Sequence, residues 1–296
     1  MRHRFLTLSL AAAVLFLASI TSRADELSVY TTNYPLQYFA ERIAGDHAGV
    51  VFPAPAEADP AVWVPDQATI AAYQKADLIL LNGATYEKWV SKVSLPRSRM
   101  VDTSRGFRDR FIIMEENVTH THGSGGEHAH SNVAFTTWLD FTLAVEQAKA
   151  VAKALIRKKP GEKATFEKNL AALERDLMAL DGELRKIAAR TPSRPLVGSH
   201  PVYQYLARRY GLNLKSVHWE PDERPNEAQW RELKGLLKDH PARHIVWEGE
   251  PLGDIRTELG NLGLQSIVFA PCGNRPGDGD FLEVMRRNIA NLDGAL

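Results

Sequence analysis

Apolar residues recur at alternating steps of four and three between residues 161 and 190, in the most regular pattern of the chain. This spacing places one apolar stripe on a single face of an α-helix, and the remaining faces carry charges of both signs. The stripe consists of Phe166, Leu170, Leu173, Leu177, Leu180, Leu184 and Ile187. At a rise of 1.5 Å per residue, about 28 residues form a rod roughly 40 Å long. The pattern predicts a long amphipathic helix that could join two lobes.

The chain before this helix alternates between short apolar runs and amphipathic segments. We predict strands at residues 27–31, 50–53, 76–81 and 100–102, and helices at residues 35–44, 66–75 and 86–93. The run ADLILL at 76–81 is typical of a buried parallel strand. Strands that alternate with helices indicate βαβ units and a parallel sheet.

The same alternation resumes at Pro195, after a further helix predicted at 138–156. We predict strands at 196–199, 214–218, 244–247 and 266–269, and helices at 202–210, 226–238, 252–262 and 281–292. The simplest architecture is α/β, with two lobes on parallel sheets joined by the long rigid helix. Residues 25–137 would form the N-terminal lobe, 138–192 a helical connector and 193–296 the C-terminal lobe. Ligands of such sheets bind beyond the carboxyl ends of the strands, which would face each other across an interlobe cleft.

The first 24 residues have the pattern of a secretory signal peptide. A positive start at Arg2 and Arg4 precedes an apolar run over about residues 5–20, and small residues stand near Ala24, where a signal peptidase would cleave. The run is short for a membrane-spanning helix, and no cysteine stands at the expected cleavage point. We therefore expect a soluble mature chain from Asp25, exported to a bacterial periplasm without a lipid anchor.

Charge and cysteine content narrow the possible functions. The chain has 36 Lys+Arg and 36 Asp+Glu, so the loss of Arg2, Arg4 and Arg23 leaves a mature net charge of about −3. The sequence has no basic stripe, which argues against nucleic-acid binding. Cys272 is the single cysteine, so the chain has no internal disulfide and must rely on its core for stability.

A histidine-rich segment is the strongest chemical signal in the sequence. His120, His122, His128 and His130 fall within the polar, glycine-rich loop at 117–132, with Glu127 among them. Imidazoles on a glycine-rich backbone can wrap a transition metal such as Zn²⁺, Cu²⁺ or Ni²⁺, and each pair two residues apart could chelate. The alternative is a solvated loop that binds metal incidentally, and the number of histidines does not select among these metals.

Other side chains that can bind metals follow predicted strands of the C-terminal lobe. His200 comes directly after the strand at 196–199, Glu248 and Glu250 follow the strand at 244–247, and Cys272 follows the strand at 266–269. Because these strand ends share one edge of a sheet, the four residues are candidates for one site. Each of them could instead be an ordinary structural or solvated loop residue.

The sequence motifs give little support for a catalytic function. The sequence contains no G-x-S-x-G elbow, no phosphate-binding or dinucleotide glycine pattern and no H-E-x-x-H. Ser199 and His200 are adjacent on a strand and would point to opposite faces of the sheet, which is unsuitable for a nucleophile and its base. We therefore expect a binding protein rather than an enzyme.

The order of these segments resembles the zinc/manganese solute-binding proteins of bacterial ABC importers, of the zinc-uptake type. The likeness covers nearly the whole mature chain. It rests on the motifs TNYPL at 32–36, ADP at 58–60, ADLILLNG at 76–83, WLD at 138–140, HPVYQY at 200–205, ARRYGL at 207–212 and the terminal helix from 281. The resemblance implies two lobes around a long rigid helix, a periplasmic location and a divalent metal as cargo.

The metal site that the resemblance implies is degenerate. The family pattern places metal ligands at four positions, and only His200 carries one, because Ala61, Thr136 and Ala270 occupy the other three. Tight zinc sites use three or four protein ligands. Three explanations remain: Glu248, Glu250 or Cys272 substitute, the histidine-rich loop supplies the missing imidazoles, or the cleft holds another cargo such as a metal chelate, or none.

These observations together predict a monomeric periplasmic solute-binding protein that captures a divalent metal for the membrane permease of an ABC importer. Zinc is the first choice of cargo, and manganese, copper and nickel are the alternatives. The alternative is a periplasmic metal buffer or chaperone that delivers to no permease, or a binding protein whose cleft has lost the usual metal site and holds another cargo.

Overall fold

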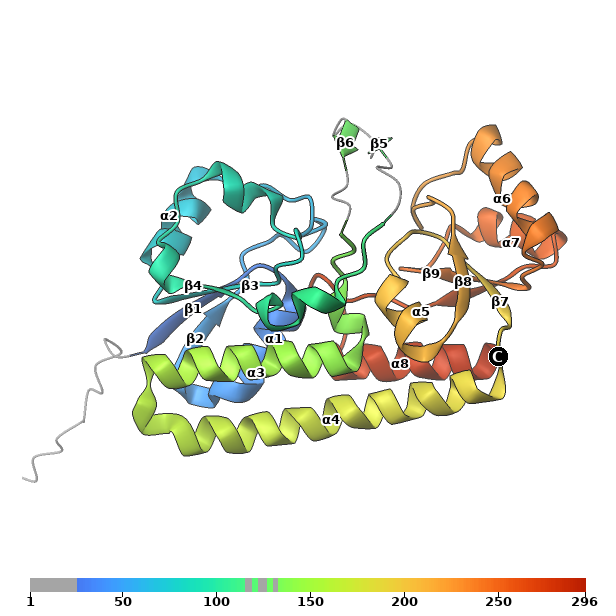
Figure 1. Cartoon of the computed structure of the whole chain (residues 1–296). Helices are drawn as coiled ribbons and strands as arrows, with labels where there is room; N and C mark the ends of the chain where they lie inside the picture. Colours follow the sequence, from blue (N-terminus) through green and yellow to red (C-terminus); the bar gives the residue numbers. More distant parts are fainter. Residues whose placement is uncertain (1–25, 115–118, 122–126, 130–132) are drawn as a thin grey trace, which may run out of the picture.

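The computed structural model describes residues 26–114, 119–121, 127–129 and 133–296. The expected signal peptide therefore lies outside the described residues. Two four-stranded parallel sheets form the centres of two lobes, as the alternating pattern predicts (Figure 1). Within the described residues, no helix combines the length and the apolar character needed to cross a membrane.

The N-terminal lobe is built on a sheet with strand order β2-β1-β3-β4. Its strands are β1 (Leu27–Thr31), β2 (Ala48–Val51), β3 (Leu78–Leu81) and β4 (Met100–Asp102), and its helices are α1 (Tyr34–Ala44) and α2 (Gln67–Lys75). All four residues of β3 are buried, in agreement with the continuous apolar run. The Asn33 side chain accepts a hydrogen bond from the Leu36 N–H and so caps the start of α1.

The C-terminal lobe repeats this design with strand order β10-β9-β7-β8. Its strands are β7 (Pro195–Gly198), β8 (Asn213–Ser216), β9 (His244–Trp247) and β10 (Gln265–Val268), and its helices are α5 (Gln204–Tyr210), α6 (Glu227–Asp239), α7 (Gly253–Asn261) and α8 (Phe281–Ala295). A separate apolar cluster fills this lobe around Trp219, whose ring centroid lies 4.7 Å from that of Trp230 and 6.2 Å from that of Trp247.

Three helices run beneath the two lobes, and the longest of them lies alongside the other two. α3 (Phe141–Lys158) and α4 (Lys163–Arg190) form an antiparallel pair, and α8 packs against α4 (Figure 1). The predicted stripe of α4 is buried except at Leu170, which is partly exposed. The long helix is therefore confirmed, and it extends along both lobes as expected.

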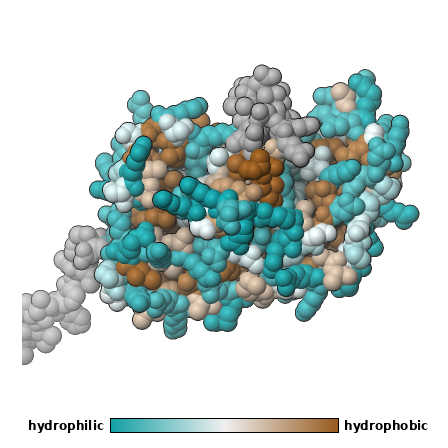
Figure 2. Space-filling view, in the orientation of Figure 1, coloured by the Kyte–Doolittle hydropathy of each residue, from teal (hydrophilic) through white to brown (hydrophobic). Residues whose placement is uncertain are grey.

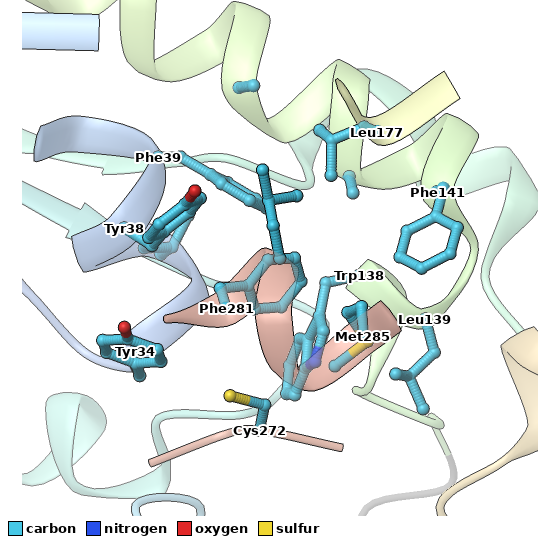
Figure 3. Packing of buried hydrophobic residues seen from close by; sticks show 14 of the residues in the cluster. Tyr34, Tyr38, Phe39, Trp138, Leu139, Phe141, Leu177, Cys272, Phe281 and Met285 are labelled. Carbon is cyan, nitrogen blue, oxygen red and sulfur yellow. The ribbon is translucent and has the colours of Figure 1, made fainter. Parts of the chain in front are cut away.

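One apolar core joins the two lobes across these helices. The ring of Phe281 on α8 lies 5.5 Å from Phe39 and 5.6 Å from Tyr38, both on α1 of the other lobe (Figure 3). Leu177 of α4 and Trp138 belong to the same cluster. The outer surface in this view is mainly hydrophilic, with one apolar group near the centre and smaller apolar patches on either side (Figure 2).

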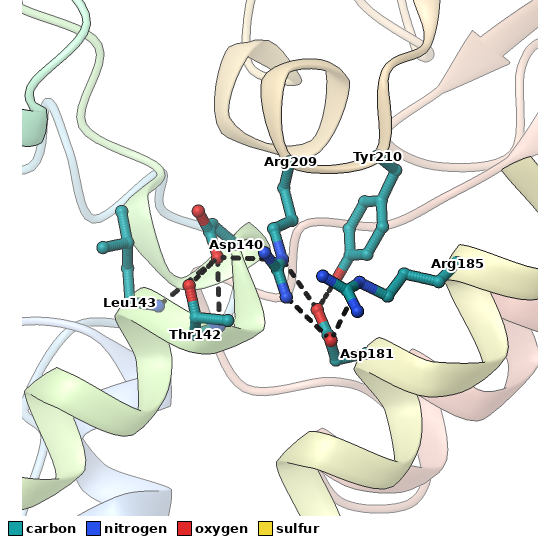
Figure 4. Close-up of polar contacts among 7 residues, drawn as sticks. All are labelled: Asp140, Thr142, Leu143, Asp181, Arg185, Arg209 and Tyr210. Carbon is teal, nitrogen blue, oxygen red and sulfur yellow. Dashed lines mark hydrogen bonds and ion pairs between the residues drawn. The ribbon is translucent and has the colours of Figure 1, made fainter.

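A buried ion network also links α4 to α5 and to the start of α3 (Figure 4). Asp181 is 3% exposed and accepts two hydrogen bonds of 2.8 Å from the Arg209 guanidinium and one of 3.1 Å from the Tyr210 hydroxyl. Arg185 lies 3.5 Å from the same carboxylate, and Arg209 also lies 3.7 Å from Asp140. The network fixes the C-terminal lobe to the long helix.

Two predicted helices have different limits in the structure. The helix expected at 86–93 is only a 3-10 turn, Lys88–Lys92. The helix expected at 138–156 begins at Phe141, because the Asp140 side chain accepts hydrogen bonds from the Thr142 and Leu143 N–H groups and acts as the N-cap.

The region expected to be a loop contains some regular structure. The 3-10 helix Arg105–Arg110 precedes it, and the two short strands β5 (Thr119–Thr121) and β6 (Glu127–Ala129) pair within it in antiparallel fashion. The remaining 3-10 turns of the described residues are Gly45–His47, Arg97–Arg99, Thr137–Leu139 and Pro160–Glu162.

Candidate functional site

A pocket of about 680 Å³ lies where the carboxyl ends of the two sheets face each other. Segments that follow β7, β8, β9 and β10 contribute His200, Glu220, Glu248 and the residues from Ala270 onward. The N-terminal lobe and the start of the connector contribute Ala58, Asp59, Pro60, Ala61, Val62, Tyr86, Lys88, Phe135, Thr136 and Trp138. The interlobe cleft expected for such sheets is therefore present.

His200 is held between two carboxylates at the wall of this pocket. Its Nδ1 lies 3.0 Å from Glu248 Oε1, and its Nε2 lies 3.5 Å from Glu220 Oε1. Burial by itself would lower the pKa of His200, but the hydrogen bond and charge of Glu248, with the charges of Glu220 and Asp59, outweigh burial and raise this pKa. The ring of His218 lies 6.0 Å from that of His200, at an interplanar angle of 88°.

The four positions that the family resemblance assigns to metal ligands converge on this pocket. Ala61, Thr136, His200 and Ala270 all line it. Thr136 is 4% exposed, and its hydroxyl donates a 2.5 Å hydrogen bond to the Val202 carbonyl oxygen. At these four positions the pocket therefore has the imidazole of His200, the methyl groups of Ala61 and Ala270, and a Thr136 hydroxyl that is already hydrogen-bonded. Among the described residues, no cluster of three or more His, Cys, Asp or Glu side chains is arranged to hold a metal ion.

The candidate substitute ligands occupy different surroundings. Glu248 and Cys272 line the pocket, whereas Glu250 is 65% exposed and forms an ion pair with Arg256 of α7. Burial raises the pKa of the Cys272 thiol to about 12. Since a cysteine must be deprotonated to bind a metal, this environment disfavours Cys272 as a ligand.

The histidine-rich segment is attached beside the pocket. A backbone bridge pairs Ile113 with Val133, and Phe135 and Thr136, two and three residues further along the chain, line the pocket wall. The backbone register of β5 and β6 pairs His120 with His128. His122 and His130 lie outside the described residues, as do the side chains of His120 and His128.

Glu87 forms a polar cluster directly behind the pocket wall made by Tyr86 and Lys88. Its carboxylate accepts hydrogen bonds of 2.5 Å from the Thr32 hydroxyl and the Asn82 N–H, and one of 3.2 Å from the Gly83 N–H. Burial raises the pKa of Glu87 to about 7, although these hydrogen bonds favour the charged form.

We expect Glu87 to make stability fall as the pH rises. A carboxyl group whose pKa is higher in the folded state than its ordinary value near 4.5 contributes stability below that value, and the contribution is lost as the pH rises through about 7. Allowing for screening of this partly exposed residue, the loss between pH 5 and pH 8 should be about 1–2 kcal/mol. Urea unfolding at both pH values should show that Glu87→Gln removes this part of the pH dependence.

The exposed Glu232 provides the matched control, because Glu232→Gln removes a carboxylate of α6 that is in solvent. This variant should keep the pH dependence of the natural protein. If Glu87→Gln also keeps it, the pKa of Glu87 is not raised in the folded state.

Comparison with known proteins identifies the family. The family described as zinc-uptake complex component A, periplasmic, matches residues 29–295. The chain belongs to this family. The high-affinity zinc uptake system protein ZnuA of Bacillus subtilis is 30% identical over 289 residues, which cover 94% of this chain and 90% of that protein. The resemblance inferred from the sequence motifs is thereby confirmed.

A longer relative and a solved structure agree with this family. The zinc-binding lipoprotein AdcA of Streptococcus pneumoniae is 28% identical over 298 residues, which cover 96% of this chain but 59% of the relative. The chain thus spans about three fifths of that protein. The crystal structure of the metal-dependent lipoprotein YcdH from Bacillus subtilis has a TM-score of 0.78 at 24% identity, and covers 92% of this chain and 100% of that one. The expected fold, two parallel-sheet lobes with a long helix as in metal-type periplasmic binding proteins, is confirmed.

Sequence reasoning missed Glu220, whose Oε1 lies 3.5 Å from His200 Nε2. Its signal was its place shortly after the strand β8, the same kind of position that pointed to His200 and Glu248. The backbone N–H of the neighbouring Trp219 donates a 2.7 Å hydrogen bond to the Ser199 carbonyl oxygen and holds the Glu220 segment beside His200.

Proposed function

We propose that the protein is a periplasmic solute-binding protein that captures a divalent transition metal, zinc first, for an ABC importer. The observation that carries this proposal is His200, held by two carboxylates at the wall of a pocket between the two lobes. Membership in an uptake family, rather than in a family of enzymes, supports a binding role, as do relatives named for zinc binding and zinc uptake. In this proposal the chain acts as a monomer, and its partner is the permease of the importer.

The histidine-rich segment is the second part of the proposed metal site. In this proposal His120, His122, His128 and His130 bind ions through their imidazoles, in a segment that precedes Phe135 and Thr136 of the pocket lining along the chain. Two kinds of zinc site follow from this arrangement: one in the segment, and one in the pocket with His200 as its imidazole. Export without a lipid anchor remains a prediction from the residues around position 24.

Zinc titration of the mature protein, residues 25–296, tests both parts by calorimetry. Substitution of all four segment histidines by alanine should remove at least one bound ion per chain and leave a weaker site in the pocket. Adding His200→Ala to that variant should weaken the remaining site at least tenfold, because zinc sites depend on imidazole ligands. Parallel titrations with Mn²⁺, Ni²⁺ and Cu²⁺ would rank the metals.

His47→Ala serves as the matched control, since His47 lies outside the pocket and pairs with Glu162 at 3.4 Å. This change should leave zinc binding unaltered. If the natural protein retains none of the four metals, the proposal is wrong. If the natural protein binds zinc and the four-alanine variant does not, the pocket is not an independent site for the free ion.

A periplasmic metal buffer is the second candidate, and the lack of a three-ligand cluster among the described residues favours it. A buffer would hold zinc mainly in the histidine-rich segment and would not depend on His200. The same titration separates the two functions: a buffer loses nearly all its capacity in the four-alanine variant, and is indifferent to His200→Ala.

A further inference from the structure

The imidazole of His200 is oriented like a metal-binding histidine whose second ring nitrogen is held by a carboxylate. Its Nδ1 lies 3.0 Å from Glu248 Oε1, a hydrogen-bond distance. Histidines that bind metals nearly always donate their second ring N–H to a carboxylate or carbonyl, which fixes the tautomer and leaves the other nitrogen for the ion. Glu248 therefore fits the role of an orienting partner better than the role of a substitute ligand.

The other ring nitrogen stands at a suitable distance from a second possible ligand. His200 Nε2 and Glu220 Oε1 are 3.5 Å apart, and both residues line the pocket. Two ligand atoms at about 2.0–2.1 Å from a tetrahedral Zn²⁺ ion are about 3.3 Å from each other. A small adjustment would let one zinc ion bind both atoms.

These two atoms supply only half of a tetrahedral site. The described residues contain no third His, Cys, Asp or Glu arranged to complete it. The pocket has a volume of about 680 Å³, which is far more than a single ion needs. A ligand that enters with the metal could therefore occupy the remaining space and the open coordination positions.

The walls of the pocket fit a small organic molecule that carries carboxylates. The ring of Tyr86 lies 5.2 Å from Phe135 and 5.9 Å from Trp138, so these three side chains form an aromatic wall. Lys88 and Arg275 also line the pocket, and their cations would attract the carboxylates of a chelator.

We propose that His200 and Glu220 form a half-site, oriented by Glu248, that binds zinc as a chelate with a small carboxylate-bearing molecule. The chelator supplies the two remaining metal ligands, and its body contacts the aromatic wall. This inference rests on the proposed function as a zinc-capturing protein and names the form in which the pocket takes its cargo.

The sign of the chelator effect tests the inference. In the variant with alanine at the four segment histidines, zinc affinity is measured with zinc alone and with equimolar citrate or L-histidine added. A site for the bare ion must lose apparent affinity, because the chelator competes for zinc. The half-site should instead gain at least tenfold with one of these chelators, and native mass spectrometry should show protein, zinc and chelator in a 1:1:1 complex.

Variants at the two carboxylates test the assigned roles. Glu220→Gln removes a metal ligand and should reduce binding of the chelate at least tenfold, whereas Glu248→Gln keeps an acceptor for Nδ1 and should have a smaller effect. Glu223→Gln, at an exposed position of the same loop that lies outside the pocket, is the matched control and should change nothing.

Two results would overturn the inference while leaving zinc capture intact. One is tight binding of zinc alone that citrate and L-histidine both weaken. The other is chelate binding that Glu220→Gln does not affect. A natural protein that binds no zinc in any form contradicts the proposed function itself.

Discussion

Replacement of Asp181 by alanine is expected to lower the free energy of unfolding by about 3–5 kcal/mol. The carboxylate is 3% exposed and balances Arg209 through two hydrogen bonds of 2.8 Å. Its removal would leave the Arg209 guanidinium partly buried without its main counter-charge, and the Tyr210 hydroxyl without its acceptor. Urea unfolding followed by circular dichroism measures the loss. Since Arg209 belongs to α5 and Asp181 to α4, the C-terminal lobe should become less stable first.

Asp176 provides a matched control on the same helix. It pairs with Arg42 at 2.7 Å, but both side chains are about one third exposed. Ion pairs in solvent contribute about 0–1 kcal/mol, so Asp176→Ala should have a small effect. If Asp181→Ala costs no more than Asp176→Ala, the buried network does not fix the lobe to the helix.

The contrast between these aspartates shows what the sequence could not reveal about the long helix. The apolar stripe predicts the helix and its buried face because helical contacts repeat every three or four residues. The burial of Asp181 depends on Arg209, which lies 28 positions further along the chain. No local pattern contains that pairing, because it arises only when α5 packs on α4.

The sequence predicted the candidate site in part, as it did the long helix. His200 and Glu248 follow strands of one parallel sheet, so their meeting in the pocket follows from the topology. Glu250 is only two residues from Glu248, yet it turns to Arg256 at the surface, because the chain has left the strand and has no fixed alternation there. Glu220 became a candidate only when the hydrogen bond from Trp219 to Ser199 placed its segment beside His200.

The pocket wall gives the second prediction with a large effect. Trp138→Ala is expected to lower the free energy of unfolding by about 3–5 kcal/mol, the usual cost of truncating a large buried aromatic side chain. Trp138 is 1% exposed, and its ring packs 5.9 Å from that of Tyr86. Its indole N–H donates a 2.7 Å hydrogen bond to the carbonyl oxygen of Pro271 (the neighbouring Cys272 is drawn beside the ring in Figure 3). One side chain therefore connects the start of the helical connector with the loop that follows β10.

Trp138→Phe separates the two contributions of this residue. Phenylalanine keeps most of the ring but leaves the Pro271 carbonyl without its donor, so a loss of about 1–3 kcal/mol is expected. Zinc binding should fall in the order natural protein, Trp138→Phe, Trp138→Ala, because each step loosens the wall of the pocket that His200 also lines. Chemical unfolding and zinc calorimetry on the same samples measure both properties. If stability falls while zinc affinity stays unchanged, Trp138 supports the fold only, and the position of the pocket wall does not control metal capture.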